Sequence, residues 1–260
     1  MNLVFADFLH IKTMEKVFKM MTVEILQHTY SPELLIATAA RCCYSNTPIP
    51  ELKNGLSENP EEVERLIKML ISINHESVFE HVSFTFAIDG ISRSCSHQLV
   101  RHRIASYSQR SQRYCNVKKL EVVTPPAITM DSAVSAEFNA VMCNIADAYD
   151  NIRNKLIDRY VTQGMDQKSA EKKANEDARY VLPNACTTSI VMTMNVRSLL
   201  NFFKERCCNR AQWEIRDVAN EMLRQCKETA PLLFSKAGPD CAVYGKCPEG
   251  KMSCGNPIKM

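Results

Sequence analysis

Glycine is scarce in this sequence, and its scarcity limits the ways in which the protein can bind phosphates. Only seven glycines occur among 260 residues, and none of them forms the GxGxxG or GxxxxGK[ST] pattern of a glycine-rich phosphate loop. The backbone amides of such a loop are therefore not available here. Phosphates must instead be bound by side chains, and arginine suits them best because its guanidinium donates two parallel hydrogen bonds.

Long apolar runs are also missing, since no stretch approaches the roughly 20 residues that are needed to span a bilayer. The start of the sequence lacks a basic stretch followed by an apolar segment, so we expect no secretory signal. Twelve cysteines without an export signal indicate a reducing compartment in which they remain thiols. We therefore expect a cytoplasmic protein that has no membrane partner.

Acidic residues are absent between positions 90 and 120, although the formal net charge of the whole chain is only +3. The positive charges in that window are Arg93, Arg101, Arg103, Arg110, Arg113, Lys118 and Lys119. Such a concentration indicates an anionic partner, either several phosphates or a nucleic acid; the alternative is a solvated helix face. Almost every side chain between residues 101 and 113 can donate hydrogen bonds, which favours a nucleotide site.

Hydrophobic periodicity predicts a mixture of strands and helices. Strands are predicted over residues 22–26, 82–88, 121–124 and 187–194. Helices are predicted over residues 32–42, 60–73, 92–101, 132–163, 167–180, 197–207 and 211–230. Ser31 and Asn59 precede Pro-Glu and are expected to cap helices, whereas Asp89-Gly90 is expected to end a strand. We expect one α+β domain over residues 21–236, an N-terminal extension over residues 1–20 and a Cys/Gly/Pro-rich tail over residues 237–260.

Two clusters resemble metal sites only in part. His75, Glu80 and His81 differ in spacing from the HExxH pattern, in which both histidines share one helical face, so a polar loop is the alternative. The cysteines of the tail would make either an incomplete metal knuckle or free thiols, and they are Cys241, Cys247 and Cys254. We expect no bound metal.

Five blocks of residues follow one another in a fixed order. They are His75-x-Ser77-x-x-Glu80-His81, Arg101-His102-Arg103 with Ser111 after a gap of seven residues, the Ala-Arg-Tyr-Val-Leu-Pro run of residues 178–183, Asn195-x-Arg197-Ser198-Leu-x-Asn201, and Ala211-Gln212-Trp213-Glu214-Ile215. With these blocks the sequence resembles the flavin-dependent (alternative) thymidylate synthases, and the resemblance covers residues 22–234.

This resemblance implies an enzyme that converts dUMP to dTMP for de novo dTTP synthesis, taking a methylene group from methylenetetrahydrofolate and a hydride from NADPH through FAD. It implies a twisted, mainly antiparallel sheet flanked by helices, and a homotetramer whose sites are shared between chains. The positions that match FAD contacts are Ser77, Arg101, His102, Arg103, Gln109, Asn195, Arg197 and Asn201. The positions that match dUMP contacts are Gln98, Arg101, Gln109, Arg110, Ser111, Gln112, Arg113, Arg179 and Arg206.

The chemistry of these residue types agrees with the implied roles. Arg206 keeps its proton and cannot be a general base, but it can stabilise negative charge on the uracil N3 and the adjoining oxygen. No protein nucleophile is required, and Ser111 is interpreted as a binding residue because no His-Asp arrangement activates it. Gln109 stands where many relatives carry Glu, so it keeps the hydrogen bonds without the charge.

Two other functions are alternatives to the synthase interpretation. An RNA- or nucleotide-binding protein that uses residues 93–119 would need interleaved exposed aromatic residues, and this segment offers only Tyr107 and Tyr114. A different flavin or nucleotide enzyme could have kept the same scaffold. The synthase interpretation itself leads us to expect no nucleic-acid partner.

Overall fold

The structure, a computed structural model, describes residues 21–115, 117 and 120–258. The extension predicted over residues 1–20 lies outside the described residues, and so do Lys118 and Lys119 of the basic window. The chain divides into two compact units. Among the described residues, the smaller contains residues 112–183, and the larger combines residues 21–111 with those from Asn184 onward. Each unit is described by itself.

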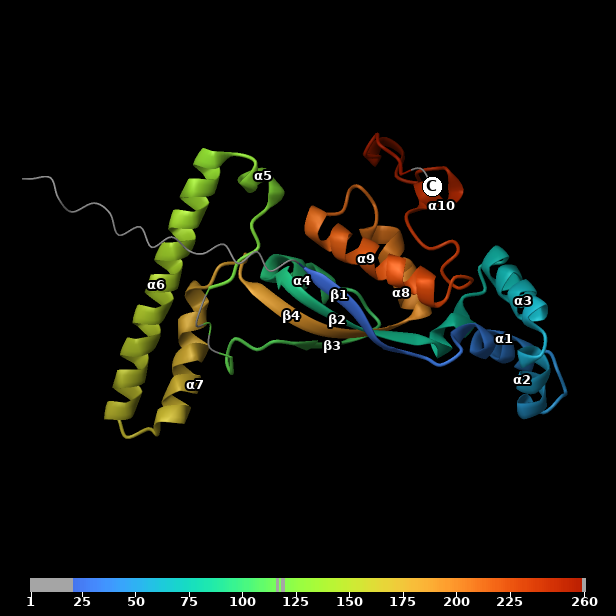
Figure 1. Ribbon diagram of the computed structural model, residues 1–260, viewed down its shortest axis with the longest axis horizontal. Coiled ribbons are helices and arrows are strands. Elements are labelled where there is room, and N and C mark those ends of the chain that lie inside the picture. Colours follow the sequence, from blue (N-terminus) through green and yellow to red (C-terminus); the bar gives the residue numbers. More distant parts are fainter. Residues whose placement is uncertain (1–20, 116, 118–119, 259–260) are drawn as a thin grey trace, which may run out of the picture. The chain divides into compact units, whose positions relative to one another are not determined.

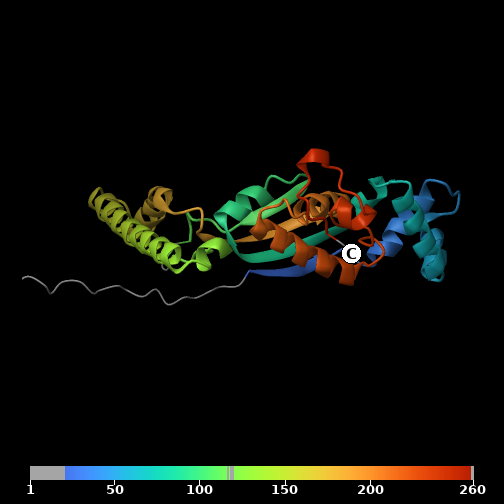
Figure 2. The ribbon, with the colours of Figure 1, turned by 90° about the horizontal axis from the view of Figure 1, so that it is seen from above.

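An antiparallel sheet forms the centre of the larger unit. Its strands among the described residues are β1 (Thr22–His28), β2 (Ser83–Ser92), β3 (Ala105–Gln109) and β4 (Thr187–Asn195). They lie in the order β1-β2-β4-β3 (Figure 1). Helices α8 (Val196–Arg206) and α9 (Trp213–Thr229) cover one face of this sheet, as Figures 1 and 2 show.

The two faces of the sheet differ because alternate side chains of a strand point to opposite sides. Phe84 and Phe86 of β2 are fully buried, and the ring of Phe84 packs edge-on against Phe234 at 5.5 Å between centroids. On the other face, the hydroxyls of Thr85 and Thr193 share a hydrogen bond of 2.9 Å between β2 and β4. The apolar core of this unit therefore lies between the sheet and its covering helices.

The remaining helices of the larger unit surround this core. They are α1 (Pro32–Cys42), α2 (Ile49–Ser57), α3 (Pro60–Ser72), α4 (Arg93–Leu99) and α10 (Asp240–Tyr244), with 3-10 turns η1 (Ser77–His81) and η3 (Gly250–Met252). Helices α1, α2 and α3 gather beyond the end of β1 in both views (Figures 1 and 2). No helix among the described residues is long and apolar enough to cross a membrane.

The smaller unit is helical. It contains α5 (Pro126–Thr129), α6 (Ser132–Thr162), α7 (Gln167–Ala178) and the 3-10 turn η2 (Arg179–Val181). Helices α6 and α7 lie side by side in both views (Figures 1 and 2), and Arg153 Nε on α6 donates to Asn175 Oδ1 on α7 at 2.7 Å. Gly164 between them has a φ of 92°, which glycine adopts without steric cost.

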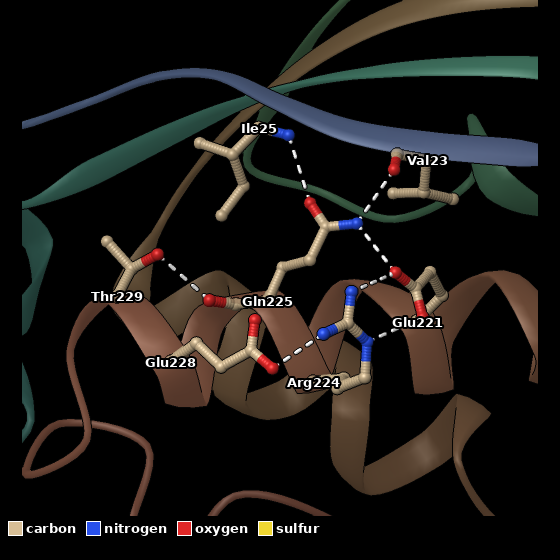
Figure 3. Close-up of polar contacts among 7 residues, drawn as sticks. All are labelled: Val23, Ile25, Glu221, Arg224, Gln225, Glu228 and Thr229. Carbon is tan, nitrogen blue, oxygen red and sulfur yellow. Dashed lines mark hydrogen bonds and ion pairs between the residues drawn. The ribbon is translucent and has the colours of Figure 1, made fainter.

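Gln225 of α9 holds the edge strand β1. Its amide oxygen accepts from the backbone N–H of Ile25 at 3.0 Å, and its amide nitrogen donates to the carbonyl of Val23 at 2.7 Å (Figure 3). The same nitrogen donates to Glu221 at 2.8 Å, one helical turn earlier. One side chain thus satisfies two backbone groups that an edge strand would otherwise leave unpaired.

The predicted α+β class and antiparallel sheet are confirmed, and the long strands and helices begin within a few residues of the expected positions. Asn59 caps α3 as predicted, accepting from Glu62 N at 3.1 Å. Ser31 does not cap α1 with its side chain, because its backbone is left-handed at φ 45°. The strand predicted over residues 121–124 is wrong, since only an isolated bridge at Val122 occurs there. The domain boundaries stay predictions.

Strand β2 continues past Asp89-Gly90, where the sequence predicted its end. The register with β4 shifts between Asp89 and Ile91, and Gly90 has a φ of 75°. Glycine allows such a bulge because it adopts positive φ at no steric cost, and the extra residue bends the strand without ending it. The strand therefore reaches Ser92, which caps the next helix.

Candidate functional site

The start of α4, the helix that leads into the Arg101-His102-Arg103 turn, is held by a buried carboxylate. The backbone N–H and the hydroxyl of Ser92 each donate to Glu214 at 2.6 Å, and the Ser92 hydroxyl accepts from Cys95 N at 3.0 Å. Glu214 lies in the first turn of α9 and is only 5% exposed. The Ala211–Ile215 block thus contains a structural anchor, although the sequence assigned Glu214 no role.

Strand β3 separates the basic segment into two groups. Ala105 pairs with Met194 near the end of β4, whereas Gln109 pairs with Ile190 farther back along it. The four residue-to-residue steps from Ala105 to Gln109 correspond to roughly 13 Å of strand. Arg101 and Arg103 therefore lie near the end of β4 where α8 begins, and Arg110 lies at the opposite end of β3.

The start of α8 brings together several of the residues predicted to contact FAD. Asn195 caps this helix, accepting from Ser198 N at 2.8 Å. Arg197 forms ion pairs with two carboxylates beside Ser77, with Glu80 through Nη1 and with Glu76 at 3.7 Å through Nε. These carboxylates raise the Arg197 pKa, with Glu80 as the main cause. A phosphate that approached this guanidinium would have to exchange with them.

Asn201 lies one turn farther along α8. Its amide nitrogen is 3.5 Å from Glu205 Oε1, and its side chain is exposed. It also lines a cavity of about 880 Å³ in the larger unit, together with Glu76 and the lysines Lys204, Lys236 and Lys246. This volume lies within the range of roughly 300–1,000 Å³ that is typical of small-molecule sites.

The end of α8 meets the Arg101-His102-Arg103 turn through one hydrogen bond. Arg206 Nε donates to His102 Nε2 at 2.8 Å, and Glu205 Oε2 lies 4.0 Å from His102 Nδ1. Burial is the main cause that lowers the His102 pKa, the Arg206 charge lowers it further, and Glu205 opposes them. Arg206 and Glu205 also line a cavity of about 290 Å³ together with Cys208, Cys241 and Cys247.

Tyr107 of β3 supports the same turn. Its hydroxyl donates to the carbonyls of Leu99 and His102, at 2.9 Å and 3.0 Å. Burial raises the pKa of Tyr107 to about 12, so it remains a donor at neutral pH. A single phenol thus joins the end of α4 to the centre of the turn. No signal in the sequence indicated this role apart from the position of Tyr107 a few residues after the motif.

Gln109 is bonded at the other end of β3. Its amide nitrogen donates to Ser96 Oγ at 2.9 Å and Thr188 Oγ1 at 3.4 Å. Arg110 lies 3.7 Å from Asp89. The structure therefore separates Gln109 and Arg110 from the Arg101-His102-Arg103 turn. Gln98 and Ser111 are both half-buried.

In the smaller unit, two of the arginines predicted to contact dUMP meet at one residue. Arg113 pairs with the Glu176 carboxylate at 2.8 Å, and Arg179 Nε donates to the Glu176 carbonyl at 3.1 Å. Gln112 is half-buried next to Arg113 in sequence, and the Arg113 guanidinium stands 5.7 Å from the Tyr114 ring centroid. Both arginines thus lie at the C-terminal end of α7.

Thiols and carboxylates do not gather into a metal site in the part of the chain that the structure describes. Glu80, one of the three residues considered for metal binding, is engaged by Arg197. All twelve cysteines are free thiols. The tail is tied to α8 by an ion pair from Lys204 to Asp240 at 3.0 Å, and to the segment after α8 by one from Arg210 to Glu249 at 2.6 Å.

Known proteins are similar to this sequence over nearly its whole length. The sequence model of a family described as "Thymidylate synthase complementing protein" matches residues 24–232. A Clostridium tetani protein named flavin-dependent thymidylate synthase is 53% identical over 238 residues, covering 92% of this chain and 94% of that protein. Proteins with the same name from Geobacter sulfurreducens and Pyrococcus furiosus are 47% and 39% identical. Those alignments cover 90% and 88% of this chain, and 94% and 90% of the relatives.

Proposed function

The chain belongs to the flavin-dependent thymidylate synthases, and from this membership we propose that it converts dUMP to dTMP with methylenetetrahydrofolate as methylene donor and NADPH as reductant. The proposal places the reaction in de novo dTTP synthesis, in a homotetramer whose sites are shared between chains. The free thiols support a reducing, cytoplasmic setting. The proposal depends on the position of Arg206: it lines a cavity, and its guanidinium is oriented by a hydrogen bond to His102.

The donor groups of the larger unit fit a flavin dinucleotide. Within the described residues, Arg101 and Arg103 form no ion pair, and both are exposed near the start of α8. Two guanidinium groups from residues two positions apart in the chain would suit a pyrophosphate, and Ser77, Asn195, Arg197 and Asn201 would supply further donors. The chemistry that FAD contributes when bound is transfer of the NADPH hydride to the one-carbon group, while the protein binds and orients the reactants.

Arg206 would act on the uracil ring by charge. Its guanidinium stays protonated, so it would stabilise negative charge that develops on N3 and the adjoining oxygen. Arg113 and Arg179, which meet at Glu176, would bind the nucleotide phosphate, with Ser111 and Gln112 as neighbouring donors. The remaining positions proposed for dUMP are Gln98, Arg101, Gln109 and Arg110.

Two buried thiols near Arg206, Cys95 and Cys207, are poor candidates for a protein nucleophile. Burial is the main cause that raises the pKa of Cys95, and the Glu214 carboxylate raises it further. The Arg206 charge opposes this shift without cancelling it. Burial likewise raises the pKa of Cys207 to about 12. Because the thiolate is the reactive form, these two cysteines are unsuited to attack a pyrimidine.

A nucleic-acid partner for the basic segment is less well supported. Its arginines lie at opposite ends of β3, and the Tyr107 hydroxyl is bonded to backbone carbonyls. A half-buried ring held in this way is a poor stacking surface for a base.

Release of tritium from 5-labelled dUMP tests the proposal, and it should require both FAD and methylenetetrahydrofolate. Purified protein should be yellow, and its flavin absorption should bleach when NADPH is added. Arg206→Ala should reduce tritium release by at least 10²-fold while flavin stays bound, because a charge that stabilises the transition state would be lost. Arg224→Ala, which removes an exposed arginine of α9, is the matched control. Protein that takes up no FAD, or an Arg206→Ala variant with unchanged turnover, would contradict the proposal.

A further inference from the structure

The hydrogen bond between Arg206 and His102 determines the protonation state of the imidazole. An arginine side chain only donates hydrogen bonds, so His102 Nε2 must be the acceptor in the 2.8 Å contact with Arg206 Nε. The ring is therefore neutral and carries its proton on Nδ1. With Nε held in this way, the plane of the guanidinium is oriented, and its two terminal nitrogens remain for other partners.

Glu205 acts on the other side of the ring. Its Oε2 lies 4.0 Å from His102 Nδ1, which is longer than a direct hydrogen bond. The carboxylate is 51% exposed, and it precedes Arg206 on α8. Its influence on the imidazole is consequently electrostatic and favours a positive charge on the ring, in opposition to Arg206.

The surroundings of His102 leave the ring little freedom. The side chain is 9% exposed, and the Phe202 ring packs edge-on against it at 4.9 Å between centroids. The Tyr107 hydroxyl holds the His102 carbonyl at 3.0 Å. One nitrogen of the ring accepts from Arg206, and the other lies 4.0 Å from Glu205 Oε2, so both nitrogens face residues of α8.

We propose that His102 is a positioning residue, whose neutral imidazole holds the Arg206 guanidinium in the orientation that dUMP activation requires, with Glu205 adjusting the charge of the imidazole. This inference rests on the proposed role of Arg206. It gives the His102 ring a task distinct from the flavin contact that the family resemblance implies for this position.

Protonation of His102 would abolish the positioning contact. The charged groups that face its ring are Arg206 and Glu205 of α8, while Tyr107 of β3 contacts its carbonyl. Burial and then Arg206 lower the His102 pKa. As the pH falls through this lowered pKa, Nε2 gains a proton and can no longer accept from Arg206. Turnover should therefore decline on the acid side at a pH below the ordinary histidine value of about 6.5.

Two substitutions of His102 separate positioning from packing. His102→Phe keeps an aromatic ring beside Phe202 but removes the acceptor, whereas His102→Gln offers an amide oxygen near the place of Nε2 and does not titrate. In the flavin-loaded enzyme, we expect His102→Phe to lower kcat for tritium release by about 10- to 100-fold, the equivalent of one hydrogen bond to a charged group. His102→Gln should recover most of this loss, and its turnover should lack the acid-side decline.

Glu205→Gln tests the electrostatic part. Removal of a charge that favours the protonated ring lowers the His102 pKa further, so the acid-side decline should move to lower pH by a few tenths of a unit, the size typical of an exposed ion pair. Glu228→Gln removes an exposed carboxylate of α9 that pairs with Arg224, and it should leave the pH profile unchanged. A shift to higher pH in Glu205→Gln would overturn the assigned sign.

A stability measurement checks the buried neutral histidine without relying on turnover. The unfolded chain takes up a proton near the ordinary pKa, and the folded chain does so only at lower pH. The free energy of unfolding should therefore fall as the pH drops through the interval between these values. Urea unfolding of the wild-type protein should show this loss, and His102→Gln should lack it. The same loss in both proteins would overturn the proposal.

Further outcomes separate this inference from the proposed function. If His102→Phe keeps its kcat, or if its activity and bound flavin fall together, the ring does not position Arg206. If the wild-type protein releases no tritium, the proposed function fails instead. Urea unfolding would then still show whether His102 is neutral in the folded chain.

Discussion

Glu214 is the residue whose removal should most directly loosen the start of α4. Its carboxylate accepts two hydrogen bonds of 2.6 Å, from the backbone N–H and the hydroxyl of Ser92. Glu214 itself is only 5% exposed. Glu214→Ala would remove both acceptors and leave the buried N–H of Ser92 without a partner.

The magnitude follows from these contacts. A hydrogen bond to a charged group contributes about 1.5–3 kcal/mol, and a buried donor that is left unsatisfied costs about 1–3 kcal/mol. Because the two bonds share one carboxylate, they are not additive, and we expect Glu214→Ala to lower the free energy of unfolding by about 3 kcal/mol. Glu214→Gln should cost about 1 kcal/mol, since its amide can accept from the Ser92 N–H and donate to the Ser92 hydroxyl.

Urea unfolding followed by far-ultraviolet circular dichroism measures this difference, provided that the variants have the same dependence of the free energy of unfolding on urea concentration. Glu228→Ala, on an exposed position of α9, is the control and should change stability by no more than about 1 kcal/mol. Flavin content of the folded variants reports on the Arg101-His102-Arg103 turn that follows α4, and it should fall in Glu214→Ala. A loss of stability below about 1 kcal/mol in Glu214→Ala would refute the anchoring role.

Two more substitutions test other contacts. Gln225→Leu deletes the hydrogen bonds to Ile25 and Val23 seen in Figure 3. It should lower the free energy of unfolding, measured by urea unfolding, by about 2 kcal/mol. No change would mean that water satisfies the backbone groups of β1 equally well. Arg197→Ala should weaken FAD binding about 10-fold in a fluorescence titration, with little loss of stability because its pairs with Glu76 and Glu80 are exposed. Unchanged FAD affinity would assign Arg197 to those pairs alone.

Local residue chemistry was sufficient to predict most of the long elements. Asn59-Pro60 predicted the start of α3, and alternation of Phe84, Phe86 and Ile88 predicted β2, because capping and side-chain direction depend on near neighbours. Helix α2 and strand β3 were not predicted. In β3, Ser106 and Ser108 alternate with half-buried residues too weakly to indicate a strand, and its ladder depends on β4, more than eighty residues later.

The site shows the same division. The scarcity of glycine and the density of arginine predicted that side chains would bind phosphate, and five short motifs identified the family before any contact was known. Some residues of those motifs turned out to have structural tasks. Asn195 caps α8 and Gln109 bonds to Ser96, as the structure shows, while their predicted contacts with ligands stay predictions.

The sequence by itself therefore determined the family, the kind of phosphate-binding group and the residues to consider. Only the tertiary structure decided which of them meet. Arg206 and His102 are 104 residues apart in the chain, and Ser92 and Glu214 are 122 apart. A hydrogen bond depends on distance and direction within a few tenths of an ångström, and a pKa depends on burial. Both are set by how the helices pack on the sheet, which no local pattern of residues specifies.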